Sequence, residues 1–256
     1  MTQINALTET IQSLGRMGIL LLLMVKKMFS GKMTVESVLK QIHFIGVRSM
    51  VVVSMAGLFV GMVIALLFHD TLVRFGAVSM AGSAVGLSLI WELGPVLTAL
   101  IIIGRAGSAT CAEISIMRAE QQIDALECMA IDPVRFLLSP RLLAGVISIP
   151  LLSALFIVVG IFGGYFVSVV LFQLSSGVYF QGMNDTVLWR DLSLCFTKSI
   201  TFSVLILWIV CSKVYYMHLN SDAHGSEGVS YVTTAAVVHS SITVLFADYI
   251  ISALLL

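Results

Sequence analysis

Residues 91–109 read WELGPVLTALIIIGRAGSA and decide the class of fold. The stretch places one carboxylate, Glu92, inside an apolar segment, follows it with Gly94-Pro95 and reaches Arg105 near its end. A lone ionisable group at membrane depth costs about 2.5 kcal/mol or more and is usually retained for function. Beyond Arg105 the chain becomes polar. We therefore interpret the stretch as a membrane span that contains a functional site and leads into a cytoplasmic contact element.

The composition is that of a membrane protein with several spans. Hydrophobic residues make up 59% of the chain, charged residues only 11%, and the mean hydropathy is +1.04. Soluble domains carry about 25% charged residues, which excludes that class. The four cysteines form no C-x-x-C pair, so we expect buried small side chains rather than a disulfide framework or a zinc site.

The N-terminal region, residues 1–45, is not expected to cross the membrane. Its apolar run, Met17 to Val25, is much shorter than the roughly 20 residues that a span needs. Lys26 and Lys27 follow this run, whereas the basic residues of a signal peptide precede it. Basic residues among Leu, Ile and Met are typical of helices that lie in the membrane interface, and we expect such helices here.

Five apolar segments are long enough to span, which predicts an all-α fold. They are residues 49–68, 75–104, 142–172, 192–211 and 229–256. The second is interrupted only by Glu92, and at 1.5 Å per residue it exceeds the thickness of a hydrocarbon core. We therefore expect a bend or an interfacial start in this segment, with Gly94-Pro95 as the place for the bend.

The distribution of basic residues predicts the orientation, because cytoplasmic loops carry an excess of Lys and Arg. Eleven basic residues fall before the first span, between the second and third, or between the fourth and fifth. Only Arg74 and Arg190 fall on the opposite side, and Lys198 lies within a span. We expect a cytoplasmic N-terminus, a cytoplasmic loop over 105–141, and a C-terminus on the far side.

Residues 109–130 of that loop have a helical pattern of their own. Ile116, Ile123 and Leu126 recur at helical spacing, and Asp132-Pro133 ends the pattern. A short amphipathic helix between two spans either lies on the membrane surface or docks into a groove on a soluble partner. Its acidic face is a poor ligand for anionic inner-leaflet lipid, which favours docking.

The densest motifs of the chain, between residues 86 and 135, resemble the permeases of the MlaE/YrbE family. They are Glu92-Leu-Gly-Pro95, Gly104-Arg-Ala-Gly-Ser108, Ala112-Glu-Ile114, Met117-Arg118, Glu120-Gln121, Asp124-Ala-Leu-Glu127 and Met129-Ala-Ile-Asp-Pro133. The resemblance extends more loosely over most of the chain. Some members carry a basic residue where this chain has Trp91, so charge compensation for Glu92 must come from elsewhere.

Members of this family are membrane subunits of ABC transporters that move phospholipid between the membranes of Gram-negative bacteria. The resemblance implies one permease domain over 1–256, a location in the inner membrane with a periplasmic C-terminus, and a role in outer-membrane lipid asymmetry. The partners it implies are phospholipid, a second copy of the chain, a cytoplasmic ATPase dimer, a periplasmic ring of MCE-domain subunits and often a small STAS-domain protein. We expect no nucleic-acid partner.

The chain has no ATP-binding motif of its own. It contains no G-x-x-x-x-G-K-[ST], and Ser30-Gly31-Lys32 lacks both the upstream glycine and the following hydroxyl. We expect no enzymatic activity and no directly bound cofactor, with ATP and Mg²⁺ held by the partner ATPase. The coupling element of the family corresponds to residues 109–130, and the residues expected at the ATPase interface are Glu113, Arg118, Glu120, Asp124 and Glu127.

Three ionisable groups form the candidate translocation site. Glu92 and Lys198 are opposite charges within different spans, and Asp248 lies in the last span. Counted along straight helices the first two lie at different depths, so a bend or an interfacial start of the second span is needed to bring them level. Either they face the lipid route and contact or gate the head group, or they form a structural pair that fixes helix packing.

A candidate lipid pocket lies at the outer ends of the first two spans. Its residues are Ile64, Leu67, Phe68, Thr71, Leu72 and Phe75, which line an apolar cavity at a dimer axis or face lipid and core. Small residues pack closely in membranes, so Gly57/Gly61 and Gly82/Gly86 are candidate dimer faces.

Two other function classes remain open. An ion-coupled secondary transporter of a small or amphipathic solute would also bury such charges, although it typically has repeated halves with paired interrupted helices. An intramembrane enzyme would need a nucleophile with a base in reach, and nothing like a nucleophile elbow surrounds Ser108 or Ser240. The spacing of His218, Asp222, His224 and Glu227 matches no standard metal site, which favours a solvated loop.

Overall fold

The computed structural model describes residues 2–28, 34–216 and 225–255, and every regular element in these ranges is a helix. Five continuous helical stretches are long and apolar enough to cross a membrane: Val35–Arg74, Val78–Ala119, Val134–Leu171, Trp189–Tyr215 and Gly228–Leu255. The predictions of an all-α fold and of five spans are therefore confirmed. The loop with His218, Asp222 and His224 lies outside the described residues, as does the side chain of Glu227.

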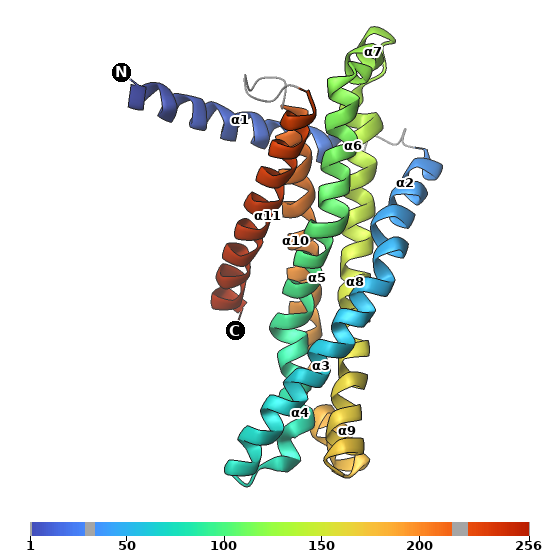
Figure 1. Cartoon of the computed structure of the whole chain (residues 1–256), viewed down its shortest axis with the longest axis vertical. Helices are drawn as coiled ribbons and strands as arrows, with labels where there is room; N and C mark the ends of the chain where they lie inside the picture. The colour runs from blue at the N-terminus through green and yellow to red at the C-terminus, as the bar shows by residue number, and fades with distance from the viewer. Residues whose placement is uncertain (1, 29–33, 217–224, 256) are drawn as a thin grey trace.

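The N-terminal helix α1 (Thr2–Met28) lies across one end of the bundle rather than along it (Figure 1). Met17, Leu20 and Met24 recur on one face of α1 and are buried. The indole nitrogen of Trp208 donates a 2.7 Å hydrogen bond to the Met17 carbonyl, and the hydroxyl of Ser139 donates one of 3.2 Å to the Met24 carbonyl. These contacts fix α1 against the spans.

The first span is longer than the sequence indicates. It comprises α2 (Val35–Ile42), the π-helical turn η1 (His43–Val47) and α3 (Arg48–Arg74) without interruption. The predicted boundary between interfacial helices ending at residue 45 and the first span is therefore wrong, because the helix is continuous there, while the interfacial location of residues 35–45 stays a prediction. At 1.5 Å per residue the whole stretch exceeds the hydrocarbon thickness, so its charged first turns extend beyond the apolar layer.

The second span is a continuous helix with two π-helical turns. After the short 3₁₀ turn η2 (Val78–Met80) it runs through α4 (Ala81–Ser88), η3 (Leu89–Leu93), α5 (Gly94–Ile102), η4 (Ile103–Gly107) and α6 (Ser108–Ala119). The irregularity expected at Gly94-Pro95 falls in the turn just before it and has the form of a π-helical turn. Such turns are rare and frequently mark functional sites.

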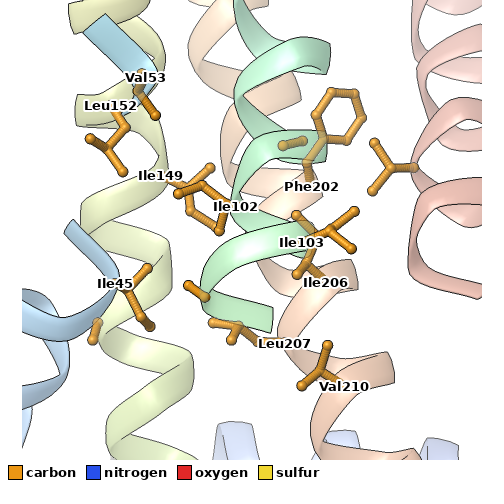
Figure 2. Packing of buried hydrophobic residues seen from close by; sticks show 14 of the residues in the cluster. Ile45, Val53, Ile102, Ile103, Ile149, Leu152, Phe202, Ile206, Leu207 and Val210 are labelled. Carbon is orange, nitrogen blue, oxygen red and sulfur yellow. The ribbon is translucent and has the colours of Figure 1, made fainter. Parts of the chain in front are cut away.

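The remaining spans are α8, α10 and α11. The third begins with the π-helical turn η5 (Val134–Leu138), continues as α8 (Ser139–Tyr165) and ends in η6 (Phe166–Leu171). A short helix α9 (Ser176–Thr186) leads into α10 (Trp189–Tyr215), and α11 (Gly225–Leu255) is last. Side chains of α5, α8 and α10, among them Ile102, Ile149 and Phe202, form the core shown in Figure 2.

Glycines allow α3 and α8 to pack backbone to backbone. A Cβ on Gly61 would lie 1.9 Å from the Gly160 carbonyl oxygen, and one on Gly57 would lie 2.6 Å from that of Phe156. A Cβ on Gly82 would lie 2.1 Å from the Tyr179 carbonyl oxygen of α9. The prediction that Gly57/Gly61 and Gly82/Gly86 form dimer faces is therefore wrong, because these glycines are already covered within the chain.

Helices α4 and α9 lie side by side at the end of the molecule opposite α1 (Figure 1). The Ser83 hydroxyl donates a 2.7 Å hydrogen bond to the Gly182 carbonyl and joins the two helices. The first turns of the second span thus pair with α9, which precedes the start of α10 at Trp189. This offset brings Glu92 and Lys198 level, although their positions along their own spans differ.

Candidate functional site

Lys198 of α10 is the centre of a polar cluster between three spans. Its ammonium nitrogen lies 2.9 Å from Glu92 Oε2 and 2.9 Å from Asp248 Oδ1. It also donates hydrogen bonds to the Trp91 carbonyl at 2.8 Å and to Ser252 Oγ at 2.7 Å. Four acceptors surround a group with three N–H donors, so one acceptor at a time is held by charge attraction alone. The predicted pairing of Glu92 with Lys198 therefore forms.

Pro95 explains why the Trp91 carbonyl is available to Lys198. In an α-helix the residue four positions later donates its N–H to this carbonyl, and proline has no N–H to donate. The π-helical turn η3 places this carbonyl and the Glu92 side chain on the same ammonium group. The local sequence Trp91-Glu-Leu-Gly-Pro95 thus supplies two of the four acceptors.

Trp91 also fixes the start of α10. Its indole nitrogen donates a 2.9 Å hydrogen bond to Asp191 Oδ1, and Asp191 Oδ2 accepts one of 2.7 Å from the backbone N–H of Leu188. Asp191 is 8% exposed, so its charge is almost fully withdrawn from solvent. The charge compensation for Glu92 comes from Lys198, while Trp91 positions the helix that carries this lysine.

The cluster is sealed on its cationic side and open on its anionic side. The Lys198 side chain is fully buried, whereas 17% of the Asp248 side chain and 41% of the Glu92 side chain are exposed. Two carboxylates against one ammonium leave a formal charge of −1. A ligand that approaches between the spans therefore meets carboxylate oxygens, which attract an ammonium group more strongly than a phosphate.

Ser252 completes the cluster and was missed from the sequence. Its hydroxyl accepts a hydrogen bond from Lys198 and donates one of 2.9 Å to Glu92 Oε1. It follows Asp248 by four residues, so the two side chains lie on one face of α11. That spacing was a usable signal, but a serine in an apolar helix more often serves packing.

The residues of the predicted lipid pocket share a helix but not one environment. Ile64 is buried, Phe68 and Leu72 are half-buried, and Leu67, Thr71 and Phe75 are exposed. Phe75, 79% exposed, is the capping residue after α3. The structure of one chain thus leaves half of this set open to lipid or to a partner, and the pocket stays a prediction.

The predicted coupling helix is divided into two helices. α6 continues the second span to Ala119, and a separate α7 (Gln122–Cys128) follows at the α1 end of the molecule (Figure 1). Gln121 has a φ of 58°, in the left-handed region, which ends α6. A single helix over 109–130 is therefore wrong in this detail, because the chain reverses at Glu120-Gln121.

The five predicted interface residues lie on both sides of this break. Arg118 pairs with Asp124 at 2.8 Å and joins α6 to α7, while Glu113 pairs with the buried Arg141 at 2.8 Å. Glu120 and Glu127 are exposed. The side chain of Ile123 is buried and holds α7 in place, so the exposed acidic residues of α7 have fixed positions.

Comparison with known proteins assigns the chain to a family. A model of the family described as Permease MlaE matches residues 38–254. The chain belongs to the MlaE permease family. It is 44% identical over 217 residues to the intermembrane phospholipid transport system permease protein MlaE of Haemophilus influenzae, covering 84% of this chain and 81% of the relative. The expected resemblance is therefore confirmed.

Other relatives of this permease family are described in similar terms. A probable ABC transporter permease protein of Rickettsia typhi is 34% identical over 244 residues, covering 95% of this chain and 92% of the relative. One of a Synechocystis species is 35% identical over 223 residues, covering 87% and 82%. The similarity spans all five apolar helices, so it concerns the whole fold and not one motif.

Proposed function

We propose that this chain is the membrane permease subunit of an ATP-driven transporter that moves phospholipid between the inner and outer membranes. The observation that carries this proposal is its 44% identity to a phospholipid transport permease over most of both chains. Such transport maintains the lipid asymmetry of the outer membrane. In this proposal the chain itself binds no ATP, and a cytoplasmic ATPase partner binds ATP and Mg²⁺ and hydrolyses the ATP.

The cluster around Lys198 is the proposed head-group contact. Its formal charge of −1 and its exposed Glu92 side chain favour the ammonium group of a zwitterionic phospholipid. A bound ammonium competes with Lys198 for the carboxylates, and this competition weakens the contacts of Asp248 and Ser252 of α11 with Lys198 of α10. Head-group arrival and movement of the last span are thereby linked through shared hydrogen bonds.

Assembly is proposed to be a permease homodimer on an ATPase dimer. The acidic residues Glu120, Asp124 and Glu127 at the end of α6 and on α7 suit a groove on a soluble partner. A periplasmic ring of MCE-domain subunits receives lipid near Leu72 and Phe75, and a STAS-domain protein binds the ATPase. The orientation follows the basic residues, with α1 and α7 on the cytoplasmic side of the inner membrane and the C-terminus on the periplasmic side.

Glu92→Gln tests the head-group contact in the reconstituted complex. The amide retains a hydrogen bond to Lys198 but removes the negative charge, so we expect ATP-driven lipid transfer to fall at least about tenfold. Dimer and ATPase assembly should remain intact. Asp70→Asn is the matched control, since Asp70 forms only an exposed pair with Arg74. Unchanged transfer by the Glu92 variant would remove the cluster from the mechanism.

Asp124→Lys tests the coupling surface. Charge reversal on α7 should lower ATPase association or separate hydrolysis from lipid transfer. It also breaks the pair with Arg118, but the Asp124 side chain is 58% exposed, and such pairs contribute about 1 kcal/mol or less to stability. Asp185→Lys is the control, because Asp185 is an exposed carboxylate on α9, at the opposite end of the molecule from α7. Normal binding and transfer by the Asp124 variant would make α7 a membrane-surface helix instead.

Photo-crosslinkers at Leu72 and Phe75 test the lipid pocket. Both positions should capture phospholipid in the intact complex, because they lie at the proposed outlet toward the MCE ring. Val158, 51% exposed on α8, is the control for contact with ordinary membrane lipid. Equal capture at all three positions would show that no dedicated pocket exists there.

An ion-coupled secondary transporter remains the alternative function. It would use the same buried charges as an ion site, and it predicts transfer that depends on an ion gradient and not on ATP. The relatives are described as ABC transporter permeases, which favours the ATP-driven function. Proteoliposomes supplied with either ATP or a proton gradient separate the two.

A further inference from the structure

A second charged site lies far from the Lys198 cluster, in a groove between the start of the first span and α6. The groove encloses about 580 Å³, and its lining includes Lys40, His43, Phe44, Arg48 and Glu113. It lies at the end of the molecule that carries α1 and α7 (Figure 1), which is the proposed cytoplasmic end. No residue of the proposed translocation site contributes to it.

Two guanidinium groups converge on one aromatic ring in this groove. Arg48 and Arg105 lie 5.9 Å and 5.7 Å from the centroid of the Phe44 ring. Arg105 donates hydrogen bonds to the Phe44 carbonyl at 2.8 Å and to Ser49 Oγ at 2.6 Å. Neither arginine forms an ion pair with a carboxylate among the described residues. Like charges held together without an anion repel each other, and a bound anion relieves that cost.

The acidic residues of the groove are already engaged elsewhere. Glu36 pairs with Lys40 at 2.9 Å, and Glu113 pairs at 2.8 Å with Arg141, whose side chain is 2% exposed. Arg48 and His43 are exposed and remain for a ligand. Guanidinium groups recognise phosphate oxygens with paired hydrogen bonds, so the groove favours a ligand with a phosphate over a neutral or cationic ligand.

Two further observations indicate a lipid with a hydroxylated head group. Gln41 lines the groove, and its buried side-chain oxygen has no hydrogen-bond partner in the described part of the chain. Gln41 as a whole is only half-buried, so rotation of its side chain toward the groove lets this oxygen accept a hydrogen bond from a ligand hydroxyl. Val47 and Val51 share one helix face and are 53% and 72% exposed, which gives acyl chains an apolar surface on the membrane side of the groove.

We propose that this groove binds the head group of an anionic, hydroxylated phospholipid, phosphatidylglycerol, from the inner leaflet. Arg48 holds the phosphate, Gln41 accepts a hydrogen bond from the glycerol hydroxyl, and the acyl chains lie along α3, toward the middle of the membrane. Basic pockets between spans at the cytoplasmic surface commonly hold anionic head groups. The site rests on the proposed function only in that both concern phospholipid, and it adds a binding site in the opposite leaflet from the proposed outlet.

The test captures lipid at Leu39, an exposed residue of the groove, in the full-length chain. A photoreactive amino acid at this position is irradiated in nanodiscs that contain equal amounts of phosphatidylglycerol and phosphatidylethanolamine. Mass spectrometry of the adducts should show phosphatidylglycerol in excess. Arg48→Gln should lower its capture about fivefold, since one basic residue near a membrane surface contributes about 1 kcal/mol. Arg48→Lys should retain most of the capture, which separates loss of charge from misfolding.

Arg16→Gln on α1 is the matched control, because its side chain is exposed and lies outside the groove. Equal capture of both lipids, or equal loss in the Arg16 and Arg48 variants, would overturn the proposal. Abolition of capture by inorganic phosphate would indicate a free-anion site, and adducts to the ATPase in the intact complex would indicate a protein interface. Each of these outcomes would overturn the lipid site without affecting the proposed transport function, because the Glu92→Gln experiment tests that function separately.

Discussion

The helices α10 and α11 are neighbours, yet the chain buries them very differently. In their most apolar windows, 61% of the residues of α10 are buried and only 11% of those of α11. The first span resembles α11, with 22% buried. The central helices therefore form the fold of one chain, whereas the flanking helices present most of their apolar surface outward. That surface is available to lipid or to a second copy.

The two helices are joined by polar contacts at one end. Asp248 and Ser252 of α11 meet Lys198 of α10, and the Arg190 guanidinium donates a 2.8 Å hydrogen bond to the Leu255 carbonyl. Polar contacts in an apolar medium are specific and can be exchanged for contacts with a ligand. Helix α10 is therefore held mainly by apolar packing, whereas α11 is held mainly by polar contacts. We call the contacts of Asp248 and Ser252 with Lys198 the clasp.

Lys198→Ala should have the largest effect on stability. Removing the fully buried cation leaves Asp248 and the Trp91 carbonyl without their donor, while Glu92 keeps only its bond from Ser252. Breaking a buried ion pair costs about 3–5 kcal/mol, and the partial exposure of Glu92 places the expected cost at about 3 kcal/mol. Thermal unfolding of the purified chain in mild detergent should show a lower midpoint. Lys213→Ala, on the same helix but only half-buried, should change it little. Equal midpoints for the two variants would contradict a structural role of the clasp.

Gly61→Ala should destabilise next most strongly. The new Cβ would lie 1.9 Å from the Gly160 carbonyl oxygen, and separating the two helices should cost about 1–3 kcal/mol. Gly104→Ala is the paired control, because a Cβ there meets nothing within 4 Å. Unfolding curves should separate these variants while the dimer fraction stays unchanged. A loss of dimer without a loss of stability would return Gly61 to a dimer face.

Trp91→Phe should have a smaller effect, centred on the start of α10. An aromatic side chain remains, although smaller, but the indole N–H and its hydrogen bond to Asp191 are lost, which costs about 1 kcal/mol. Hydrogen exchange should become faster at the first turns of α10 and stay unchanged in α11. Faster exchange in α11 alone would show that Trp91 acts on the clasp instead.

Phe246→Ser should change stability least, by about 0.5 kcal/mol or less, because this side chain is 64% exposed. Ile242, Leu245, Phe246 and Tyr249 form an exposed apolar stripe on α11, which suits a homodimer contact. Native mass spectrometry should therefore show less dimer. The same change at Phe162, 60% exposed on α8, should leave the dimer intact. An unchanged dimer in both would place the contact elsewhere.

Much of the fold could be predicted because hydrophobic length and charge placement are local properties of a sequence. The five spans, the second span as the site-bearing one, and the candidates Glu92, Lys198 and Asp248 all follow from such counting. The convergence of Glu92 and Asp248 on the Lys198 ammonium group could not be predicted, since it depends on the offset between α4 and α9 and on a π-helical turn. The partner of Gly57 and Gly61 could not be predicted either, because a face of small residues indicates close packing but not which helix packs against it.

The two π-helical turns of the second span also set the direction in which side chains on either side of them point around the helix axis. A residue in an α-helix rotates the chain by about 100°. Each wider turn therefore changes the angular relation between the residues on its two sides. Deleting one residue within Leu89–Leu93 would rotate the segment that carries Gly82 relative to the segment that carries Arg105 by about this angle. Gly82 packs closely against α9, and Arg105 forms hydrogen bonds to the first span. The π-helical turns set the angle along the second span at which both contacts form together.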